Sequence, residues 1–269
     1  MTLFSFRSLR LPIGVLLLAL LLGSQARGSD AAAPHFKAVA FDYFVIFDPN
    51  SIVPAVERVF PGKGAEFTAA WRNRQFDYCF LRSLTDNHAD FFKVTGDALD
   101  YTAEQMHLEL TPQARTQLLD AYLNLRPWPD TVAALKKLRA AGLRIITISN
   151  LSPEMLRANA EHAGIADLFD DLLSTEKNGT FKPDPRAYSL GIESLHLQKR
   201  EIVFAAFGGW DAYGAQRFGY PTVWVNRFQL PVERLGTTPD TVTPNMTGLL
   251  QFALGPSAPE ASASGRPSH

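Results

Sequence analysis

Lys37-Ala-Val-Ala-Phe-Asp42 is a short apolar run that has no helical period and stops at a carboxylate. Such a run is typical of a buried parallel strand, which would deliver Asp42 to its carboxyl end. Three further runs share the pattern and are separated by helix-like segments: Leu143–Asn150, Ile202–Phe207 and Pro221–Asn226. Strands that alternate with helices predict an α/β fold with a Rossmann-like parallel sheet. Ligands of such sheets bind beyond the carboxyl ends of the strands.

Residues 50–127 differ from the rest because they contain long helical patterns, such as Glu66–Leu84 and Ala114–Leu125, and no convincing strand. We interpret them as a helical cap domain, inserted after the first strand and covering the carboxyl edge of the sheet. The α/β core domain then comprises residues 35–49 and 128–254. Pro127 and Pro129 mark the return of the chain to this core.

The two ends of the chain read differently from its middle. Residues 1–26 have the layout of a secretory signal peptide, with Arg7 and Arg10, an apolar run from Leu11 to Leu22, and small residues at Ser24 and Ala26. We therefore expect export to a periplasm or secretion, with no membrane attachment after cleavage. Residues 255–269 contain no large apolar side chain, which predicts a disordered tail.

Composition narrows the possible functions. The 269 residues include 26 basic and 27 acidic side chains, so no overall positive field favours binding to nucleic acid. A single cysteine, Cys79, cannot form an internal disulfide. The six histidines show no spacing typical of metal ligands, so we predict no metal.

Five side chains could carry chemistry: Asp42, Ser149, Lys182 and Asp211 in the core and Arg72 in the cap. Each has a structural alternative. Asp42 could form a turn and Asp211 could cap the following helix, and Arg72 or Lys182 could lie solvated at the surface. Their combination at one edge of one sheet favours a catalytic site.

The chain resembles a known family at Phe41-Asp42, Phe47-Asp48-Pro49, Trp71-Arg72, Ser149-Asn150, Lys182-Pro183-Asp184 and Trp210-Asp211. It is similar to the haloacid dehalogenase superfamily, and more narrowly to its type II (L-2-haloacid) dehalogenases, from about Lys37 to Leu250. The resemblance implies hydrolysis of small 2-haloalkanoic acids without a cofactor. Asp42 would displace the halide and form an ester, and water would then free a 2-hydroxy acid of inverted configuration.

The resemblance also implies a role for each side chain. Lys182 would hold Asp42 ionised, because a nearby cation favours a carboxylate. Ser149 would bind the nucleophile or the substrate carboxylate, Arg72 would bind the substrate carboxylate or the halide, and Asp211 would orient or deprotonate the hydrolytic water. Substrate contacts are implied for Phe44, Asn73, Phe76, Phe91, Asn150, Tyr188 and Trp210. A homodimer is the partner that the family suggests.

Two alternatives remain open at this point. A metal-dependent phosphatase of the same fold would need acids where this chain has Phe44 and Phe207, and phenylalanine neither protonates a leaving group nor binds Mg²⁺. A carboxylate-binding relative without catalysis is motivated by lost polar contacts. Val45 or Ile46 stands where type II enzymes carry a threonine, and Ala206 and Gly208 stand where they carry a serine and an asparagine.

Overall fold

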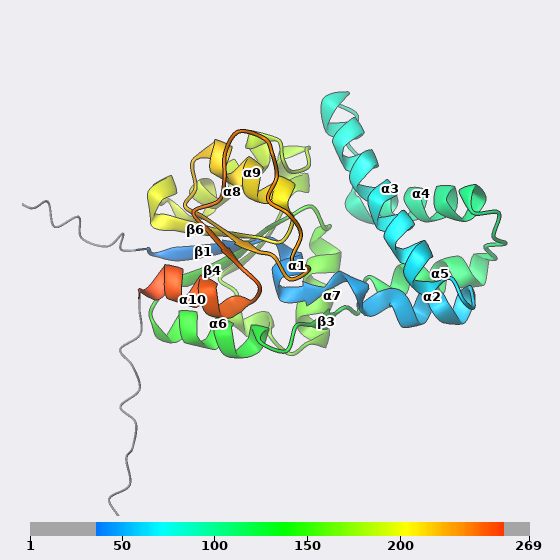
Figure 1. Cartoon of the computed structure of the whole chain (residues 1–269), viewed down its shortest axis with the longest axis horizontal. Coiled ribbons are helices and arrows are strands. Elements are labelled where there is room, and N and C mark those ends of the chain that lie inside the picture. Colours follow the sequence, from blue (N-terminus) through cyan, green and yellow to red (C-terminus); the bar gives the residue numbers. More distant parts are fainter. Residues whose placement is uncertain (1–35, 256–269) are drawn as a thin grey trace, which may run out of the picture. The chain divides into compact units, whose positions relative to one another are not determined.

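A six-stranded parallel sheet forms the centre of the computed structural model, which describes residues 36–255 (Figure 1). The strand order is β5-β4-β1-β6-β7-β8, and all neighbours pair in parallel. The strands are β1 (Ala38–Phe41), β4 (Arg144–Ser149), β5 (Asp171–Ser174), β6 (Ile202–Ala206), β7 (Thr222–Val225) and β8 (Thr241–Thr243). The predicted α/β fold with a Rossmann-like parallel sheet is therefore confirmed. The strand order reverses at β1, which makes the carboxyl end of β1 a ligand-binding position.

Each of the four predicted runs contains one of the observed strands and extends past it by one residue at one or both ends. The sequence pattern missed β5 and β8, which have only four and three residues. Both lie at the edges of the sheet, where a strand pairs with one neighbour and part of its side chains faces solvent. Short, partly polar segments of this kind carry no continuous apolar run.

Side chains alternate between the two faces of the sheet. Val39 and Phe41 of β1 belong to a core cluster shared with helices α6 (Thr131–Ala140), α7 (Pro153–His162) and α10 (Met246–Leu254). Ala38 and Ala40 face a second cluster with α8 (Pro185–Leu195) and α9 (Gly209–Phe218). Figure 1 shows α6 and α10 on one face of the sheet and α8 and α9 on the other. Because both faces are covered, β1 is apolar throughout.

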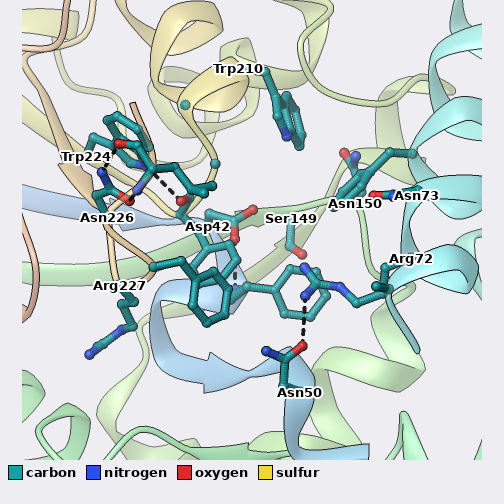
Figure 2. Close-up of a pocket in the computed structure, with 18 of the residues that line it drawn as sticks. Asp42, Asn50, Arg72, Asn73, Ser149, Asn150, Trp210, Trp224, Asn226 and Arg227 are labelled. Atoms are coloured by element: carbon teal, nitrogen blue, oxygen red, sulfur yellow. Dashed lines mark hydrogen bonds between the residues drawn. The ribbon is translucent and has the colours of Figure 1, made fainter. Parts of the chain in front are cut away.

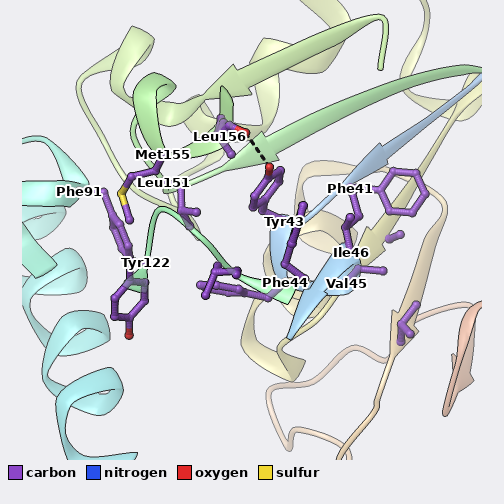
Figure 3. Packing of buried hydrophobic residues seen from close by; sticks show 14 of the residues in the cluster. Phe41, Tyr43, Phe44, Val45, Ile46, Phe91, Tyr122, Leu151, Met155 and Leu156 are labelled. Carbon is purple, nitrogen blue, oxygen red and sulfur yellow. Dashed lines mark hydrogen bonds between the residues drawn. The ribbon is translucent and has the colours of Figure 1, made fainter. Parts of the chain in front are cut away.

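A single helical turn, α1 (Tyr43–Ile46), follows β1 directly, and all four of its side chains are buried. Figure 3 shows these residues packed among their neighbours, with the Tyr43 hydroxyl donating to the Leu156 carbonyl at 2.7 Å. The α1 carbonyls also have partners from elsewhere in the chain. Trp128 Nε1 donates to the Phe44 carbonyl at 3.0 Å, Arg227 Nη2 to that of Val45 at 2.9 Å, and Thr131 Oγ1 to that of Ile46 at 3.0 Å. These bonds fix the turn next to Asp42.

Helices dominate the segment predicted as a cap: α2 (Val53–Val59), α3 (Gly64–Leu84), α4 (Phe91–Gln105) and α5 (Pro112–Ala121). Side chains in their interior are hydrogen-bonded, since Trp71 Nε1 donates to the Thr95 carbonyl at 2.9 Å and Tyr122 donates to Gln75 at 2.9 Å. A short 3₁₀ turn (Pro49–Ile52) leads into α2. The antiparallel pair β2 (Phe47–Asp48) and β3 (Arg126–Pro127) brings the start and the end of this segment together.

The predicted signal peptide and, apart from Gly255, the predicted tail lie outside the described residues. Between residues 36 and 255, none of the helices combines the length and the apolar character that crossing a membrane would require.

Candidate active site

Asp42 lies where β1 ends and α1 begins, and its two carboxylate oxygens have different partners. Its Oδ1 accepts the Phe44 backbone N–H at 2.8 Å, which caps the turn. Its Oδ2 accepts from Lys182 Nζ at 2.5 Å. The backbone N–H of Asp42 donates to the Ala205 carbonyl of β6 at 2.9 Å. The carboxylate is therefore fixed from the strand, the turn and the lysine, and only 7% of the residue remains exposed.

Lys182 joins two carboxylates in the interior. Its Nζ donates to Asp211 Oδ2 at 2.8 Å as well as to Asp42, and its side chain is fully buried. Burial disfavours the ammonium form, but the charges of Asp211 and Asp42 outweigh that effect, so the pKa of Lys182 lies above its ordinary value. Lys182 consequently remains a cation that bonds both carboxylates.

Asp211 lies in the first turn of α9 and has both of its carboxylate oxygens occupied. Oδ2 accepts from Lys182, and Oδ1 accepts from the Tyr188 hydroxyl at 2.7 Å. Burial raises the pKa of Asp211 to about 6, partly offset by the nearby Lys182 ammonium. Asp211 and Tyr188 are both fully buried behind Lys182.

One cavity of about 280 Å³ opens onto the Asp42 carboxylate (Figure 2). Residues from the sheet edge and from α3 and α4 line it together. Of the residues predicted from the sequence, nine are in its wall: Asp42, Phe44, Arg72, Asn73, Phe76, Phe91, Ser149, Asn150 and Trp210. Lys182, Asp211 and Tyr188 are not among the lining residues. The direct substrate contact predicted for Tyr188 is therefore corrected to a contact with Asp211, because Tyr188 is fully buried and its hydroxyl donates to that carboxylate.

Arg72 is the cation that faces the substrate space. Its guanidinium carbon lies 5.3 Å from the Phe44 ring centre, 5.9 Å from that of Phe76 and 6.0 Å from that of Phe207. Its one hydrogen bond within residues 36–255 is a long one, 3.4 Å from Nη1 to Asn50 Oδ1. Burial lowers the pKa of Arg72 below its ordinary value, yet a guanidinium stays protonated in proteins. A desolvated cation without a carboxylate contact is suited to bind an anion.

Ser149 and Asn150 follow β4 at the same edge of the sheet. The Ser149 hydroxyl accepts the Leu151 backbone N–H at 3.2 Å and makes no hydrogen bond to Asp42 among the residues the structure covers. The Asn150 amide oxygen accepts the Lys182 backbone N–H at 2.9 Å. The Ser149 hydroxyl proton and the Asn150 amide nitrogen thus remain available to an anionic ligand.

The three positions that depart from type II enzymes differ in their surroundings. Val45 and Ile46 are fully buried in the core, and Ala206 is buried in β6. Gly208 is different, because a Cβ there would lie 2.7 Å from Trp210 Nε1. The Trp210 indole therefore occupies the space next to Gly208 that a side chain would need.

Sequence reasoning missed several lining residues, among them Asn50, Trp224, Asn226, Phe228, Leu230 and Glu233. Asn226 to Glu233 belong to the irregular segment after β7, which has no helical or strand pattern in the sequence. The sequence indicated these residues only through their position after a predicted strand, because loops after parallel strands form the ligand-binding edge of the sheet.

Comparison with known proteins agrees with this geometry. The model of the haloacid dehalogenase-like hydrolases matches residues 36–219. The chain is 38% identical to an (S)-2-haloacid dehalogenase of Pseudomonas sp. (strain YL), over 81% of this chain and 94% of that protein. It is 36% identical to haloacetate dehalogenase H-2 of Moraxella sp. (strain B), over 80% of this chain and 97% of that protein.

A solved structure extends the likeness. The L-2-haloacid dehalogenase of Xanthobacter autotrophicus, with chloropropionic acid covalently bound, superimposes with a TM-score of 0.77 at 33% identity. The match covers 82% of this chain and all of that one. With its fold, its strand-end aspartate and these relatives in agreement, the chain belongs to the haloacid dehalogenase-like hydrolases.

Proposed function

We propose that this protein hydrolyses small 2-haloalkanoic acids to 2-hydroxy acids, with Asp42 as the nucleophile. One observation carries the proposal: a carboxylate held by buried Lys182 opens onto the same apolar cavity as the desolvated guanidinium of Arg72. The pair suits a substrate that has an electrophilic carbon and an anionic group. Relatives named for (S)-2-haloacids and haloacetate, and one structure with covalently bound chloropropionic acid, support this substrate class.

The first step is an in-line displacement. An Asp42 oxygen forms a bond to the halogen-bearing carbon, and the carbon–halogen bond breaks with its electron pair leaving on the halide. Arg72 and the Asn150 amide nitrogen face the cavity as donors for the halide or the substrate carboxylate. The aromatic rings of Phe44, Phe76 and Trp210 exclude water, so the carboxylate reacts without a full hydration shell.

The second step cleaves the ester. Water adds to the Asp42 carbonyl carbon, the carbonyl–alkoxide bond breaks, and the 2-hydroxy acid leaves with Asp42 restored. The predicted role of Asp211 is thereby refined, since it lies behind Lys182 and does not line the cavity. It holds Lys182 in place when Asp42 is an uncharged ester. Of the two protons of the water, one ends on the alkoxide as the product hydroxyl and the other leaves to solvent as Asp42 becomes a carboxylate again.

The test is a single turnover of the full chain with (S)-2-chloropropionate in ¹⁸O-labelled water. The mechanism predicts chloride release and one ¹⁸O atom in the peptide that contains Asp42, with unlabelled product oxygen. Asp42→Asn should release no chloride, whereas Asp167→Asn, which removes an exposed carboxylate, should behave as the parent. Label in the product alone would contradict the ester. A carboxylate-binding protein without catalysis would show no chloride from any haloacid.

A phosphatase reading of the same fold has little support from the site. The Phe44 and Phe207 rings lie 6.0 Å apart in the cavity wall, where a phosphatase needs one acid for the leaving group and one for Mg²⁺. Neither ring can supply a proton or a metal–oxygen bond. Phosphate-ester hydrolysis stimulated by Mg²⁺ would overturn this view.

We also propose that the protein is exported and forms a homodimer. Residues 1–26 support export, and the cleaved chain should appear in the periplasmic or extracellular fraction, beginning after Ala26. Exposed Leu81 and Leu84 on α3 support a dimer contact. Replacement of Leu84 by Glu should then yield a monomer in sedimentation experiments.

A further inference from the structure

The cavity extends to both sides of the nucleophile. Figure 2 shows Arg72, Asn73 and Asn150 on one side of Asp42 and Ser149, and Trp224 and Asn226 on the other. The first side contains Arg72 and the Asn150 amide nitrogen, the donors assigned above to the halide or the substrate carboxylate. The second side, which we call the outer lobe, consists of Trp224, Asn226 and the lining residues that contact them or lie in the same segment: Phe207, Arg227, Phe228, Leu230 and Glu233.

Most polar groups of the outer lobe already have partners. Trp224 Nε1 donates to the Phe207 carbonyl at 2.8 Å. The Asn226 side chain bonds the backbone of Leu230 at both ends, donating at 2.7 Å and accepting at 2.9 Å. The Nη atoms of Arg227 donate to Asp130 and to the Val45 carbonyl, and its Nε is buried. The Glu233 carboxylate, beside Gly209 at the start of α9, makes no hydrogen bond within residues 36–255. A ligand in this lobe therefore meets mainly hydrocarbon.

The apolar side chains of the lobe face open space. Phe207 and Phe228 pack edge to face, with ring centres 5.6 Å apart. Phe228 is 43% exposed and Leu230 is 56% exposed, although both line the cavity. Exposed large apolar side chains that line a cavity indicate a surface that a ligand covers.

The cavity is also larger than a three-carbon haloacid requires. Its volume of about 280 Å³ equals that of about nine waters, at about 30 Å³ each. A substrate whose carboxylate and halogen lie toward Arg72 must direct its remaining carbon substituent elsewhere, and the outer lobe is the apolar space on the opposite side of Asp42.

We propose that the outer lobe binds the carbon chain of the substrate and makes the enzyme select 2-haloacids with an unbranched apolar chain longer than that of 2-chloropropionate. This inference rests on the proposed dehalogenase function and adds its chain-length preference. An anionic chain end is disfavoured, because the Glu233 carboxylate has the same sign. Arg227, the cation of this lobe, already pairs with Asp130 and with the Val45 carbonyl.

The experiment measures kcat/KM by chloride release from (S)-2-chloropropionate, (S)-2-chlorohexanoate and 2-chlorosuccinate. Each buried methylene contributes up to about fourfold in affinity for the transition state, so the three extra methylenes of the hexanoate should raise kcat/KM by about tenfold or more. The succinate should react more slowly than the hexanoate. Equal or lower kcat/KM for the hexanoate would overturn the proposal.

Matched variants locate the effect. Leu230→Trp fills the lobe, so the hexanoate-to-propionate ratio of kcat/KM should fall about tenfold. Leu235→Trp changes an equally exposed leucine of the same segment that does not line the cavity, and its ratio should match the parent. Phe228→Ser, which removes apolar surface without adding bulk, should lower the ratio as well. An unchanged ratio in both Leu230→Trp and Phe228→Ser would contradict the role of the outer lobe but not the dehalogenase function. Absence of chloride release from every acid would contradict the dehalogenase function itself.

Discussion

At the scale of single residues, the Tyr188 hydroxyl influences the ionisation of Asp211, a carboxylate that does not line the cavity. Its hydroxyl donates to Asp211 Oδ1, and this bond lowers the pKa of Asp211 against the larger, raising effect of burial. Asp211 in turn holds Lys182, which holds Asp42. Because only ionised Asp211 pairs with the ammonium, activity should decline as the pH falls through about 6.

Tyr188→Phe removes that donor and should raise the pKa of Asp211 further. The acid limb of kcat/KM should then shift to higher pH, with activity at pH 8 largely retained because Asp211 is ionised there in both proteins. The measurement is the pH profile of kcat/KM for (S)-2-chloropropionate. Tyr220→Phe is the control, since its hydroxyl bonds the Tyr188 carbonyl at 2.7 Å and does not contact Asp211. An acid limb that stays in place would refute the role given to Tyr188.

Arg72 illustrates a second relation at this scale, between stability and activity. A half-buried cation among aromatic rings, with no carboxylate contact within residues 36–255, is costly in free energy. Arg72→Met should therefore leave the thermal midpoint unchanged or raise it, while kcat/KM falls by about 100-fold or more. Arg72→Lys should not restore activity, because an ammonium cannot reproduce the planar fork of donors that a guanidinium presents. Recovery of activity in the lysine variant would contradict this account.

At the scale of elements, α1 is a single turn that other elements hold in place. Four residues make too few internal hydrogen bonds to be stable alone. Their carbonyls instead accept bonds from Trp128, Thr131 and Arg227, which follow β3, begin α6 and follow β7. The position of Asp42 thus depends on two segments far from it in the chain, residues 128–131 and the loop after β7.

Thr131→Val removes one of these bonds with little change in shape. Both Thr131→Val and the control Thr222→Val delete a buried hydroxyl that donates to a carbonyl, at 3.0 Å and 2.8 Å respectively. Each should cost about 1 kcal/mol in the free energy of unfolding. Only Thr131→Val should lower kcat, by about tenfold, because a small displacement of a reacting group is expensive in rate. Equal kcat in the two variants, measured beside urea unfolding, would exclude a positioning role for α1.

At the scale of the whole molecule, the cavity couples the helices of residues 53–121 to the sheet. Arg72, Phe76 and Phe91 come from α3 and α4, and they face Asp42 and Ser149 from the sheet edge. Contacts outside the cavity join the same parts, as when the Phe91 backbone N–H donates to Glu176 Oε1 at 3.1 Å. A ligand that bridges both sides must therefore stabilise the entire fold.

Asp42→Asn allows that effect to be measured without turnover. At one hundred times its Kd, (S)-2-chloropropionate should add about 2.7 kcal/mol of stability. For a protein of this size that corresponds to a rise of about 5–10 °C in Tm. Addition of Arg72→Met to Asp42→Asn should abolish the rise, because the donor on α3 is lost. A rise that persists in the double variant would show that the acid binds elsewhere.

The sequence by itself determined the elements and the chemical groups. An apolar run that ends in Asp42 specifies a buried strand with a carboxylate at its end, since local pattern and burial are coupled. Helical periodicity likewise predicted α3 and most of α5, and Ser149 was expected at the site because it lies at the carboxyl end of such a run. These features depend on residues close together in the chain.

Only the tertiary structure decided what those groups contact. It placed Lys182 between two carboxylates, paired the Tyr188 hydroxyl with Asp211, and brought residues between Asn226 and Glu233 into the cavity wall. None of these follows from local pattern, because each joins side chains far apart in the sequence whose distances depend on how the sheet, its helices and its loops pack. The sequence of a loop without a periodic pattern does not indicate which residues the loop will contact in the folded protein.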